Sequence, residues 1–228
     1  MAQAIAKAGL DGVYSYAGRT ETPMGQPMHM RVGGFGGVVG LRAYLVAEAI
    51  THVIDATHPF AAQMSSNAVA ACTAQAVPLI ALERAPWTPS EGDRWTHVPD
   101  IPAAVAELAG PPQRVFLAIG RQHIDAFAAQ PQHHYLLRLV DEPTGALPLP
   151  LAEVVVARGP FDVETDTALM QQHGSEIVVA KNAGGKGAVA KIAAARALGL
   201  PVLMIDRPVI PERRVARSVA AVMGWLNG

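Results

Sequence analysis

The stretch that decides the fold is EIVVAKNAGGKGAVAKIAAARALGLPVLMID, residues 176–206. Two apolar runs, Glu176–Ala180 and Pro201–Ile205, each predict a buried strand. Between them, the glycine-rich segment Lys181–Gly187 precedes an alanine-rich segment, Ala188–Leu198, whose composition favours a helix. The order strand, helix, strand predicts a βαβ unit with both strands parallel in one sheet.

The same alternation extends along the whole chain. Further strands are predicted at Val13–Ala17, Met30–Val32, His52–Thr57, Pro78–Leu82, Arg114–Ile119, Tyr135–Val140 and Glu153–Ala157. Further helices are predicted at Ala2–Ala8, Gly37–Ala49, Phe60–Gln75, Pro102–Leu108, Asp162–His173 and Arg213–Leu226. Several of the strands are apolar throughout, which is typical of strands covered on both faces. We therefore predict an α/β fold with parallel sheets flanked by helices.

The segment Ala85–Arg94 is rich in proline, serine, glycine and charge, so it is the best candidate linker. It predicts two domains, residues 1–88 and residues 89–228. A dinucleotide-binding fold normally starts with a strand and a glycine-rich turn, whereas this chain starts with the helix-like stretch Ala2–Ala8. We therefore expect both the first strand and its turn to be missing.

Composition excludes several classes of protein. The formal net charge of -1 gives no sign of a nucleic-acid or membrane partner. No apolar run is long enough for a membrane span or a signal peptide, so we expect a cytoplasmic protein. Cys72 lies in an alanine-rich segment and is expected to be a small core residue on a helix. The adjacent His133 and His134 lack the spacing of metal ligands. We predict no bound metal and no serine-hydrolase site.

Four predicted strands of the C-terminal part are each followed by a cation. These residues are Arg121, Arg158, Lys181 and Arg207. Any one of them could simply reach solvent. Because the carboxyl ends of parallel strands share one edge, four together favour a crevice for a polyanion carrying carboxylates or phosphates.

Two glycine-rich loops have different interpretations. Gly33–Gly37 departs from GxGxxG, because Val39 stands where the third glycine would fall, and it fits a plain turn as well as a close approach to a nucleotide. Lys181–Gly187 precedes a predicted helix, whose N-terminal N–H groups favour an anion site. It is not a Walker A loop, because Gly187 follows Lys186 where serine or threonine would bind magnesium.

Two residues near strand ends suggest cofactor chemistry. If a strand preceded Ala2, Arg19 would follow the second strand, where an arginine suits the 2′-phosphate of NADP. His58 lies in the sequence DATHPF and titrates near neutral pH. It could donate a proton or serve as a neutral hydrogen-bonding group.

Six sequences together resemble the precorrin-6A reductase family, which includes the cobalt-precorrin-6A reductases. They are YAGRT (16–20), RVGGFGG (31–37), DATHPFA (55–61), LERAPW (82–87), RGPF (158–161) and the block from Lys181 to Pro208. The resemblance implies two Rossmann-like domains with a cleft between them. It also implies NADPH-dependent reduction of a ring double bond of precorrin-6A to precorrin-6B in cobalamin biosynthesis.

The resemblance assigns NADPH to the N-terminal domain and the substrate, a polycarboxylate corrinoid precursor, to the C-terminal one. Expected cofactor-binding residues are Arg19, Thr20, Gly34, Phe35, Gly36, Thr57 and His58. Expected substrate-binding residues are Arg121, Arg158, Lys181, Asn182, Gly184, Gly185, Lys186 and Arg207. His58 and Lys181 are the candidate proton donors, and neighbouring enzymes of the pathway are candidate partners.

Three alternatives stay open at this point. The first is a cobalt-precorrin-6A reductase using NADH or NADPH, because both substrates carry the same carboxylates. The second is a non-catalytic carrier of a tetrapyrrole or nucleotide, which the missing first strand would favour. The third is a nucleotide-sugar or phosphosugar enzyme with a two-domain cleft, which strand-end cations permit but DATHPFA does not suggest.

Overall fold

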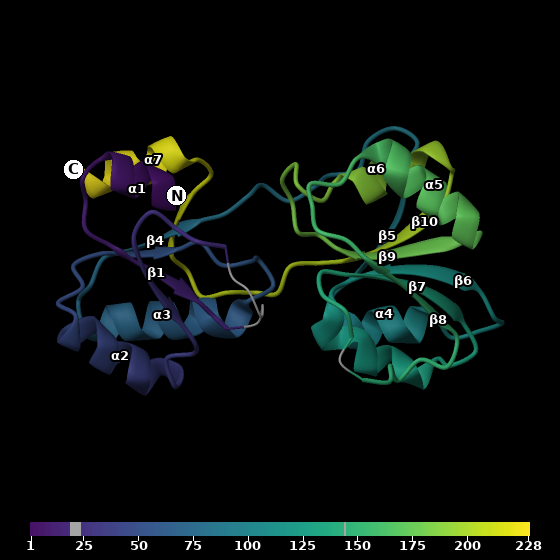
Figure 1. The fold of residues 1–228 in the computed structure, drawn as a ribbon, viewed down its shortest axis with the longest axis horizontal. Coiled ribbons are helices and arrows are strands. Elements are labelled where there is room, and N and C mark those ends of the chain that lie inside the picture. Colours follow the sequence, from purple (N-terminus) through teal and green to yellow (C-terminus); the bar gives the residue numbers. More distant parts are fainter. Residues whose placement is uncertain (19–23, 144) are drawn as a thin grey trace. The chain divides into compact units, whose positions relative to one another are not determined.

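A computed structural model describes residues 1–18, 24–143 and 145–228 (Figure 1). The chain forms two compact units. The first unit comprises Met1–Arg84 and Val209–Gly228, and the inserted unit comprises Ala85–Pro208. The predicted division at residue 88 assigned the last twenty residues to the second domain, whereas in the structure Val209–Gly228 pack with the first unit.

The inserted unit is built on one parallel sheet with the strand order β5-β10-β9-β6-β7-β8. The strands are β5 (Arg94–Val98), β6 (Arg114–Ala118), β7 (His134–Leu139), β8 (Ala152–Val156), β9 (Ile177–Lys181) and β10 (Pro201–Ile205). From β6 the chain proceeds outward to β7 and β8, then returns to the other side of β6 as β9. This reversal makes the carboxyl ends of β6 and β9 the switch point of the sheet, where open α/β folds bind ligands.

Helices cover both faces of this sheet (Figure 1). The 3-10 helix η1 (Arg121–Ala129) packs beside α4 (Ile101–Glu107) on one face, and α5 (Val163–His173) packs beside α6 (Ala190–Ala197) on the other. The α5–α6 face buries a core that includes Phe116, Met170 and Ile192. The apolar character of the strands follows from this coverage of both faces.

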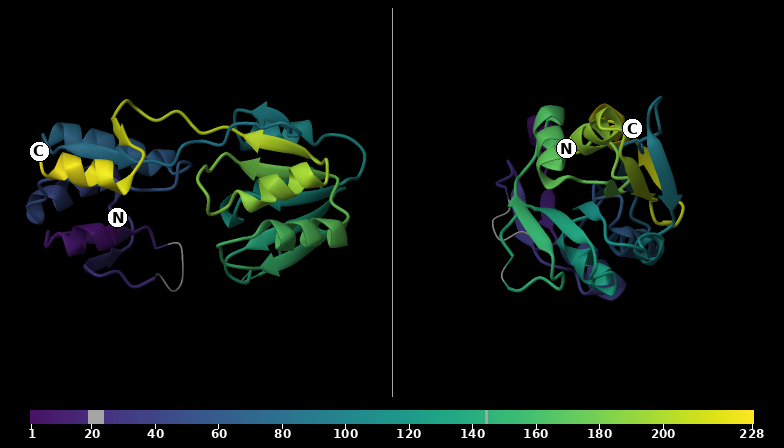
Figure 2. Two further views of the ribbon diagram at one scale, coloured as in Figure 1. Left: turned by 90° about the horizontal axis from the view of Figure 1, so that it is seen from above. Right: turned by 90° about the vertical axis from the view of Figure 1, so that its right-hand side faces the viewer.

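The first unit contains two parallel sheets in its described residues. One has the order β11-β4-β3, and the other pairs β1 with β2. The strands are β1 (Val13–Tyr16), β2 (His29–Val32), β3 (Val53–Asp55), β4 (Leu79–Leu82) and β11 (Arg214–Ala216). Figure 2 shows the returning segment, in yellow, beside β4.

Alternate residues of β3 and β4 enter two different cores, as the period of a strand requires. Val53 and Leu79 pack against α2 (Gly37–Ala47) and α3 (Ala62–Ala74). Ile54 and Ile80 face the opposite side, where α1 (Ala2–Lys7) and α7 (Val219–Leu226) lie together (Figure 1). Cys72 is buried in the α2–α3 core, as predicted.

The predicted α/β class, with parallel sheets flanked by helices, is confirmed. Three elements were missed. The sequence of β5, RWTHV, is polar because it is an edge strand, and η1, RQHIDAFAA, is a 3-10 helix of mixed polar and apolar composition. Arg214–Ala216 was assigned to the last helix, but it forms β11, and the helix starts only after Ser218, whose hydroxyl accepts the Ala221 N–H at 3.2 Å.

Candidate functional site

The turn after β3 carries a polar network at the carboxyl edge of the first unit's sheet. Asp55 Oδ1 accepts the Thr57 backbone N–H at 3.1 Å and the Thr57 hydroxyl at 2.7 Å. The hydroxyls of Thr57 and Ser65 lie 3.2 Å apart. Asp55 and Ser65 are buried, whereas Thr57 is exposed. Thr57 therefore presents an ordered hydroxyl to solvent or to a ligand.

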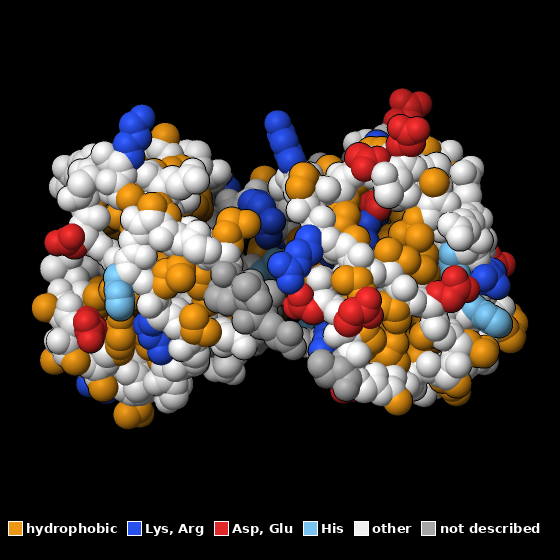
Figure 3. Space-filling model, viewed as in Figure 1, with side chains coloured by type: hydrophobic (Ala, Val, Ile, Leu, Met, Phe, Trp, Pro, Cys, Tyr) orange, Lys and Arg blue, Asp and Glu red, His pale blue; other side chains and the backbone are white. Residues whose placement is uncertain are grey.

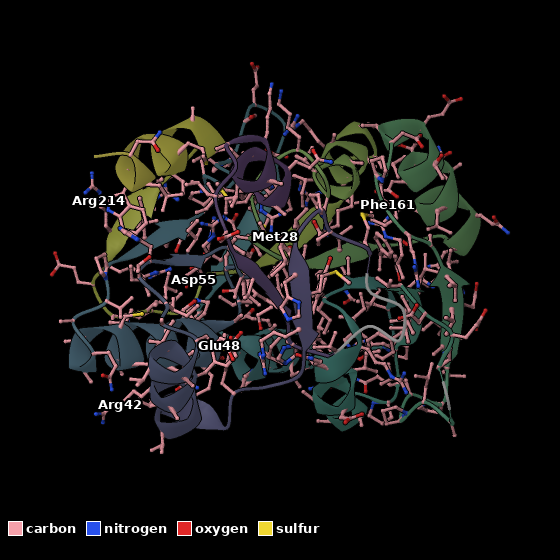
Figure 4. All side chains as sticks on the ribbon, turned by 60° about the vertical axis from the view of Figure 1, so that its left-hand side comes forward. Met28, Arg42, Glu48, Asp55, Phe161 and Arg214 are labelled. Carbon is pink, nitrogen blue, oxygen red and sulfur yellow. The ribbon has the colours of Figure 1, made fainter. Side chains whose placement is uncertain are left out.

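The returning segment supplies a cation to this network. Arg213 Nε lies 3.9 Å from Asp55 Oδ2, and Arg213 Nη2 donates to Glu83 at the end of β4. Arg217 Nη1 lies 3.4 Å from the second oxygen of Glu83. Figure 4 labels Asp55 at the level of the sheet. The last strand of the chain thus helps to fix the turn that follows β3.

His58 is exposed on the same turn. Its Nδ1 accepts the Phe60 backbone N–H at 3.2 Å, and the two rings lie 5.8 Å apart. A Nδ1 that accepts carries no proton, so in this arrangement the ring's proton is on Nε2. The geometry therefore allows His58 to act as a hydrogen-bond donor through Nε2.

Arg31 holds the loop Gly33–Gly37. Its guanidinium donates to Ser15 Oγ at 2.7 Å, to the Gly33 carbonyl at 2.9 Å and to the Gly34 carbonyl at 3.1 Å. It also lies 3.8 Å from the centre of the Phe35 ring. No role was predicted for Arg31 by itself, although its position two residues before Gly33 was a usable signal.

The backbone of this loop is open on the outside. A Cβ added at Gly34 or Gly36 would meet no atom within 4 Å. Gly36 is also the N-cap of α2, and because it has no side chain, the first N–H groups of that helix have no side-chain cap. Open backbone and helix N–H groups suit a close approach by a nucleotide phosphate.

The structure places the four strand-end cations at one edge of the inserted unit's sheet. Lys181 and Arg121 follow β9 and β6, the two strands of the switch point, and Arg207 follows β10 beside them. Arg158 follows β8, at the outer edge of the sheet, and it is exposed and paired with Asp141. Arg121, Lys181 and Arg207 thus form the compact part of the predicted group.

Trp87 and Asn182 lock the loop Lys181–Gly187 from within. The Asn182 side chain accepts the Trp87 N–H at 2.8 Å and donates to the Trp87 carbonyl at 3.0 Å. The Trp87 indole N–H donates to the Gly185 carbonyl at 2.7 Å. Asn182 is 6% exposed and its side chain binds the protein backbone, while its contact with substrate stays a prediction.

Arg207 and Gly184 complete the lock. Arg207 Nε donates to the Asn182 carbonyl at 3.0 Å, and its Nη2 donates to the Ala183 carbonyl at 3.2 Å. Gly184 has a φ of +68°, and a Cβ there would lie 2.1 Å from the Ala85 carbonyl oxygen. Gly184 is therefore needed for packing. Lys186 is exposed on the same loop, and Gly185 is half-buried.

A buried charged cluster lies against Trp87. Arg138 of β7 pairs with Asp166 of α5, and Lys191 of α6 lies 5.1 Å from the Trp87 ring centre. Burial and the nearby Arg138 lower the pKa of Lys191 to about 8, against the opposing effect of Asp166. The Arg138 guanidinium also stacks 3.8 Å from the ring of Phe161, which Figure 4 labels. A charge inside the apolar sequence YLLRL was the signal that the sequence analysis passed over.

Cys72 is buried and is not a candidate nucleophile. Burial and the charge of Asp55 raise the pKa of the Cys72 thiol to about 11, which disfavours a reactive thiolate.

Arg19 and Thr20 lie outside the described residues. Over residues 1–18, 24–143 and 145–228, no helix is long and apolar enough to cross a membrane. Figure 3 shows acidic and basic side chains together on the visible face of the inserted unit.

Comparison with known proteins identifies the family. The description "Precorrin-6x reductase CbiJ/CobK" matches residues 1–227. The chain belongs to this reductase family. The family is the one that the resemblance of the six sequences implied.

Individual relatives agree with the family. The chain is 62% identical to the precorrin-6A reductase of Rhodobacter capsulatus over 226 residues, which cover 99% of this chain and 90% of the relative. It is 40% identical to the precorrin-6A reductase of Mycobacterium tuberculosis, with 95% of this chain and 88% of the relative covered. The cobalt-precorrin-6A reductase of Priestia megaterium is 32% identical and covers 73% of this chain.

A solved structure supports the fold directly. The structure of "CobK precorrin-6A reductase" superimposes with a TM-score of 0.95 at 62% identity, covering 99% of this chain and 90% of that one. The two chains therefore share one fold over nearly the whole of this chain.

Proposed function

We propose that the protein reduces one ring double bond of precorrin-6A to give precorrin-6B, with NADPH as the reductant, in cobalamin biosynthesis. Family membership and 62% identity to a precorrin-6A reductase support the reaction. The observation that carries the substrate class is the group of Arg121, Lys181 and Arg207 around one switch point. Clustered cations suit a macrocycle that bears several carboxylates.

The first unit is proposed to bind the cofactor. When bound, a reduced nicotinamide supplies the hydride. Gly34 and Gly36 offer open backbone to the cofactor's phosphates, Phe35 lies between them, and Arg31 holds the loop in place. By its place in the sequence, Arg19 is proposed to favour the 2′-phosphate of NADPH over the hydroxyl of NADH.

The inserted unit is proposed to hold the substrate. Lys181 and Lys186 extend from a loop whose backbone is fixed by Asn182, Arg207 and Trp87. Preorganised cations lose little freedom when they bind carboxylates. Asn182 and Gly184 would then act through the loop and not by contact with substrate.

The reduction also requires a proton, which two residues could supply. Lys181, at the end of β9, would lie beside a carboxylate and could donate through its ammonium group. His58 could donate only as an imidazolium, which has a proton on both ring nitrogens and so cannot accept the Phe60 N–H at Nδ1. We propose Lys181 as the donor, because it belongs to the same edge as the substrate-binding cations.

The decisive experiment follows one atom from cofactor to product. The 228-residue chain is incubated with precorrin-6A and NADPH carrying deuterium at the transferred position, and the product is analysed by mass spectrometry. Incorporation of one deuterium, with consumption of NADPH, is the expected result. A Lys181→Met variant should bind precorrin-6A more weakly and turn over more slowly.

Parallel reactions test the alternatives. Cobalt-precorrin-6A in place of precorrin-6A, and NADH in place of NADPH, should each give a lower kcat/KM. Faster turnover of the cobalt substrate would reassign the reaction to the cobalt pathway. Binding of precorrin-6A without any consumption of either cofactor would contradict the reductase and favour a carrier.

A further inference from the structure

The hydrogen bonds of Thr57 fix the direction in which its hydroxyl can interact. Asp55 Oδ1 receives both the Thr57 N–H and the Thr57 hydroxyl, the latter at 2.7 Å. A carboxylate can only accept hydrogen bonds, so the single hydroxyl proton of Thr57 points toward Asp55. With its proton used, Thr57 Oγ1 can serve only as an acceptor for any further group.

Ser65 occupies one of the two acceptor positions of that oxygen. Its hydroxyl lies 3.2 Å from Thr57 Oγ1, and since Thr57 has no second proton, Ser65 is the donor. Ser65 is 2% exposed and is held on α3, whereas Thr57 is exposed. The second acceptor position of Thr57 Oγ1 is therefore available on the exposed side of the turn.

Arg213 stabilises the carboxylate that imposes this direction. Its side chain is 8% exposed, and its Nε lies 3.9 Å from Asp55 Oδ2 while Nη2 binds Glu83. A buried carboxylate is costly unless a cation faces it. Within the described residues, ion pairs link Asp55 to Arg213, Arg213 to Glu83, and Glu83 to Arg217.

An exposed acceptor selects the kind of ligand group that it can bind. Ionised phosphates and carboxylates are acceptors only, so they gain nothing from Thr57 Oγ1. Around the reacting ring of a reduced nicotinamide, the ribose hydroxyls can either donate or accept, whereas the carboxamide N–H can only donate and therefore requires an acceptor. This matching of donor to acceptor distinguishes the turn after β3 from the cationic edge of the inserted unit.

We propose that Asp55 is a positioning residue that fixes the Thr57 hydroxyl as an acceptor for the carboxamide N–H of the nicotinamide. This inference rests on the proposed function, because it requires a nicotinamide cofactor. It assigns the turn to the cofactor's reacting end and makes Thr57 a residue that discriminates between cofactor analogues. Asp55 acts through Thr57 and touches neither cofactor nor substrate.

The test compares two cofactors that differ at one group. NADPH has a carboxamide, whereas its 3-acetylpyridine analogue has a methyl ketone, which cannot donate. Thr57→Val should weaken NADPH binding about 10-fold, corresponding to the loss of one hydrogen bond, and should change binding of the analogue less than about 2-fold. Thr57→Ser should restore the preference for NADPH. Binding is measured by titration calorimetry.

Asp55→Ala tests the positioning role. Without the carboxylate that accepts it, the Thr57 hydroxyl proton is free to point outward toward a ketone oxygen. The variant should therefore shift the ratio of the two dissociation constants toward the analogue by about 10-fold or more. A loss of folding alone would weaken both cofactors equally, and thermal unfolding of each variant monitors this. Ser65→Ala provides a second variant, which should keep the wild-type preference.

Thr51→Val is the matched control, because Thr51 is an exposed threonine of the same unit that precedes β3 at its amino end. It should leave both affinities unchanged. If Thr57→Val loses the same affinity for NADPH as for the analogue, while the wild-type protein is an active reductase, this inference is overturned and the proposed function stands. A wild-type chain that binds neither cofactor would overturn the proposed function, and the inference with it.

Discussion

The two glycine-rich loops have similar compositions but opposite structural reasons for their glycines. In Gly33–Gly37, added Cβ atoms at Gly34 and Gly36 would meet nothing, so the glycines leave open backbone. In Lys181–Gly187, Gly184 lies against the Ala85 carbonyl and is locked by Trp87, Asn182 and Arg207. Glycine content therefore identifies a special loop, but only its neighbours tell whether the empty space serves a ligand or the packing.

The largest effect is expected from Gly184→Ala. The new Cβ would lie 2.1 Å from the Ala85 oxygen in a left-handed backbone conformation. The two costs together should lower the free energy of unfolding by about 3–5 kcal/mol, measured in urea. Gly34→Ala is the control, because its Cβ has open space, and it should change stability by less than about 0.5 kcal/mol. Equal destabilisation by both would contradict the distinction between the loops.

A second prediction concerns the charged cluster against the locked loop. The unfolded chain keeps the Lys191 proton up to the ordinary pKa of 10.5, whereas the folded protein releases it near 8. Between these values the unfolded state binds more protons, so the free energy of unfolding should rise with pH, by about 3 kcal/mol in total. Lys191→Met should lack this rise. Parallel pH dependence of the two proteins would show that Lys191 is not desolvated.

Trp87→Phe tests the hydrogen bond by which Trp87 holds the loop Lys181–Gly187. The variant keeps an aromatic ring beside Lys191 but loses the indole hydrogen bond to the Gly185 carbonyl. Stability should fall by about 1–2 kcal/mol, and the KM for precorrin-6A should rise more than kcat falls. Trp225→Phe, in the first unit, should leave the KM unchanged. A fall in kcat alone would place Trp87 in the chemical step.

The smallest effect is expected at the open loop. Arg31→Lys replaces a planar fork that serves three oxygens and the Phe35 ring by a single ammonium group. Stability should fall by about 1 kcal/mol, and the KM for NADPH should rise severalfold while the KM for precorrin-6A stays constant. A change confined to the precorrin-6A value would show that this loop does not serve the cofactor.

Much of the architecture could be predicted from the sequence, because strands covered on both faces are apolar and helices between them are rich in alanine. The strand β5 escaped because RWTHV lies at an edge of its sheet, and β11 because three residues carry no periodicity. The return of Val209–Gly228 depends on pairing with β4, far away in the chain, and no local pattern encodes that.

The candidate site, too, could be predicted only in part from the sequence. Strand-end positions predicted where Arg121, Lys181 and Arg207 lie, because parallel strands share their carboxyl edge. The same rule could not tell that Asn182 and Arg207 bind backbone carbonyls and amides of their own unit. That distinction depends on Trp87, which is distant in sequence. Arg213 was missed for the same reason.

The insertion of one unit into the other has a consequence for synthesis on the ribosome. Arg214 pairs with Ile80 across β11 and β4, so the three-stranded sheet of the first unit can close only after residues 85–208 have been made. The inserted unit has all its strands in one continuous segment and can fold while the last twenty residues are still in the exit tunnel. Nascent chains that stop before residue 209 would therefore contain a folded inserted unit beside an unfinished first sheet.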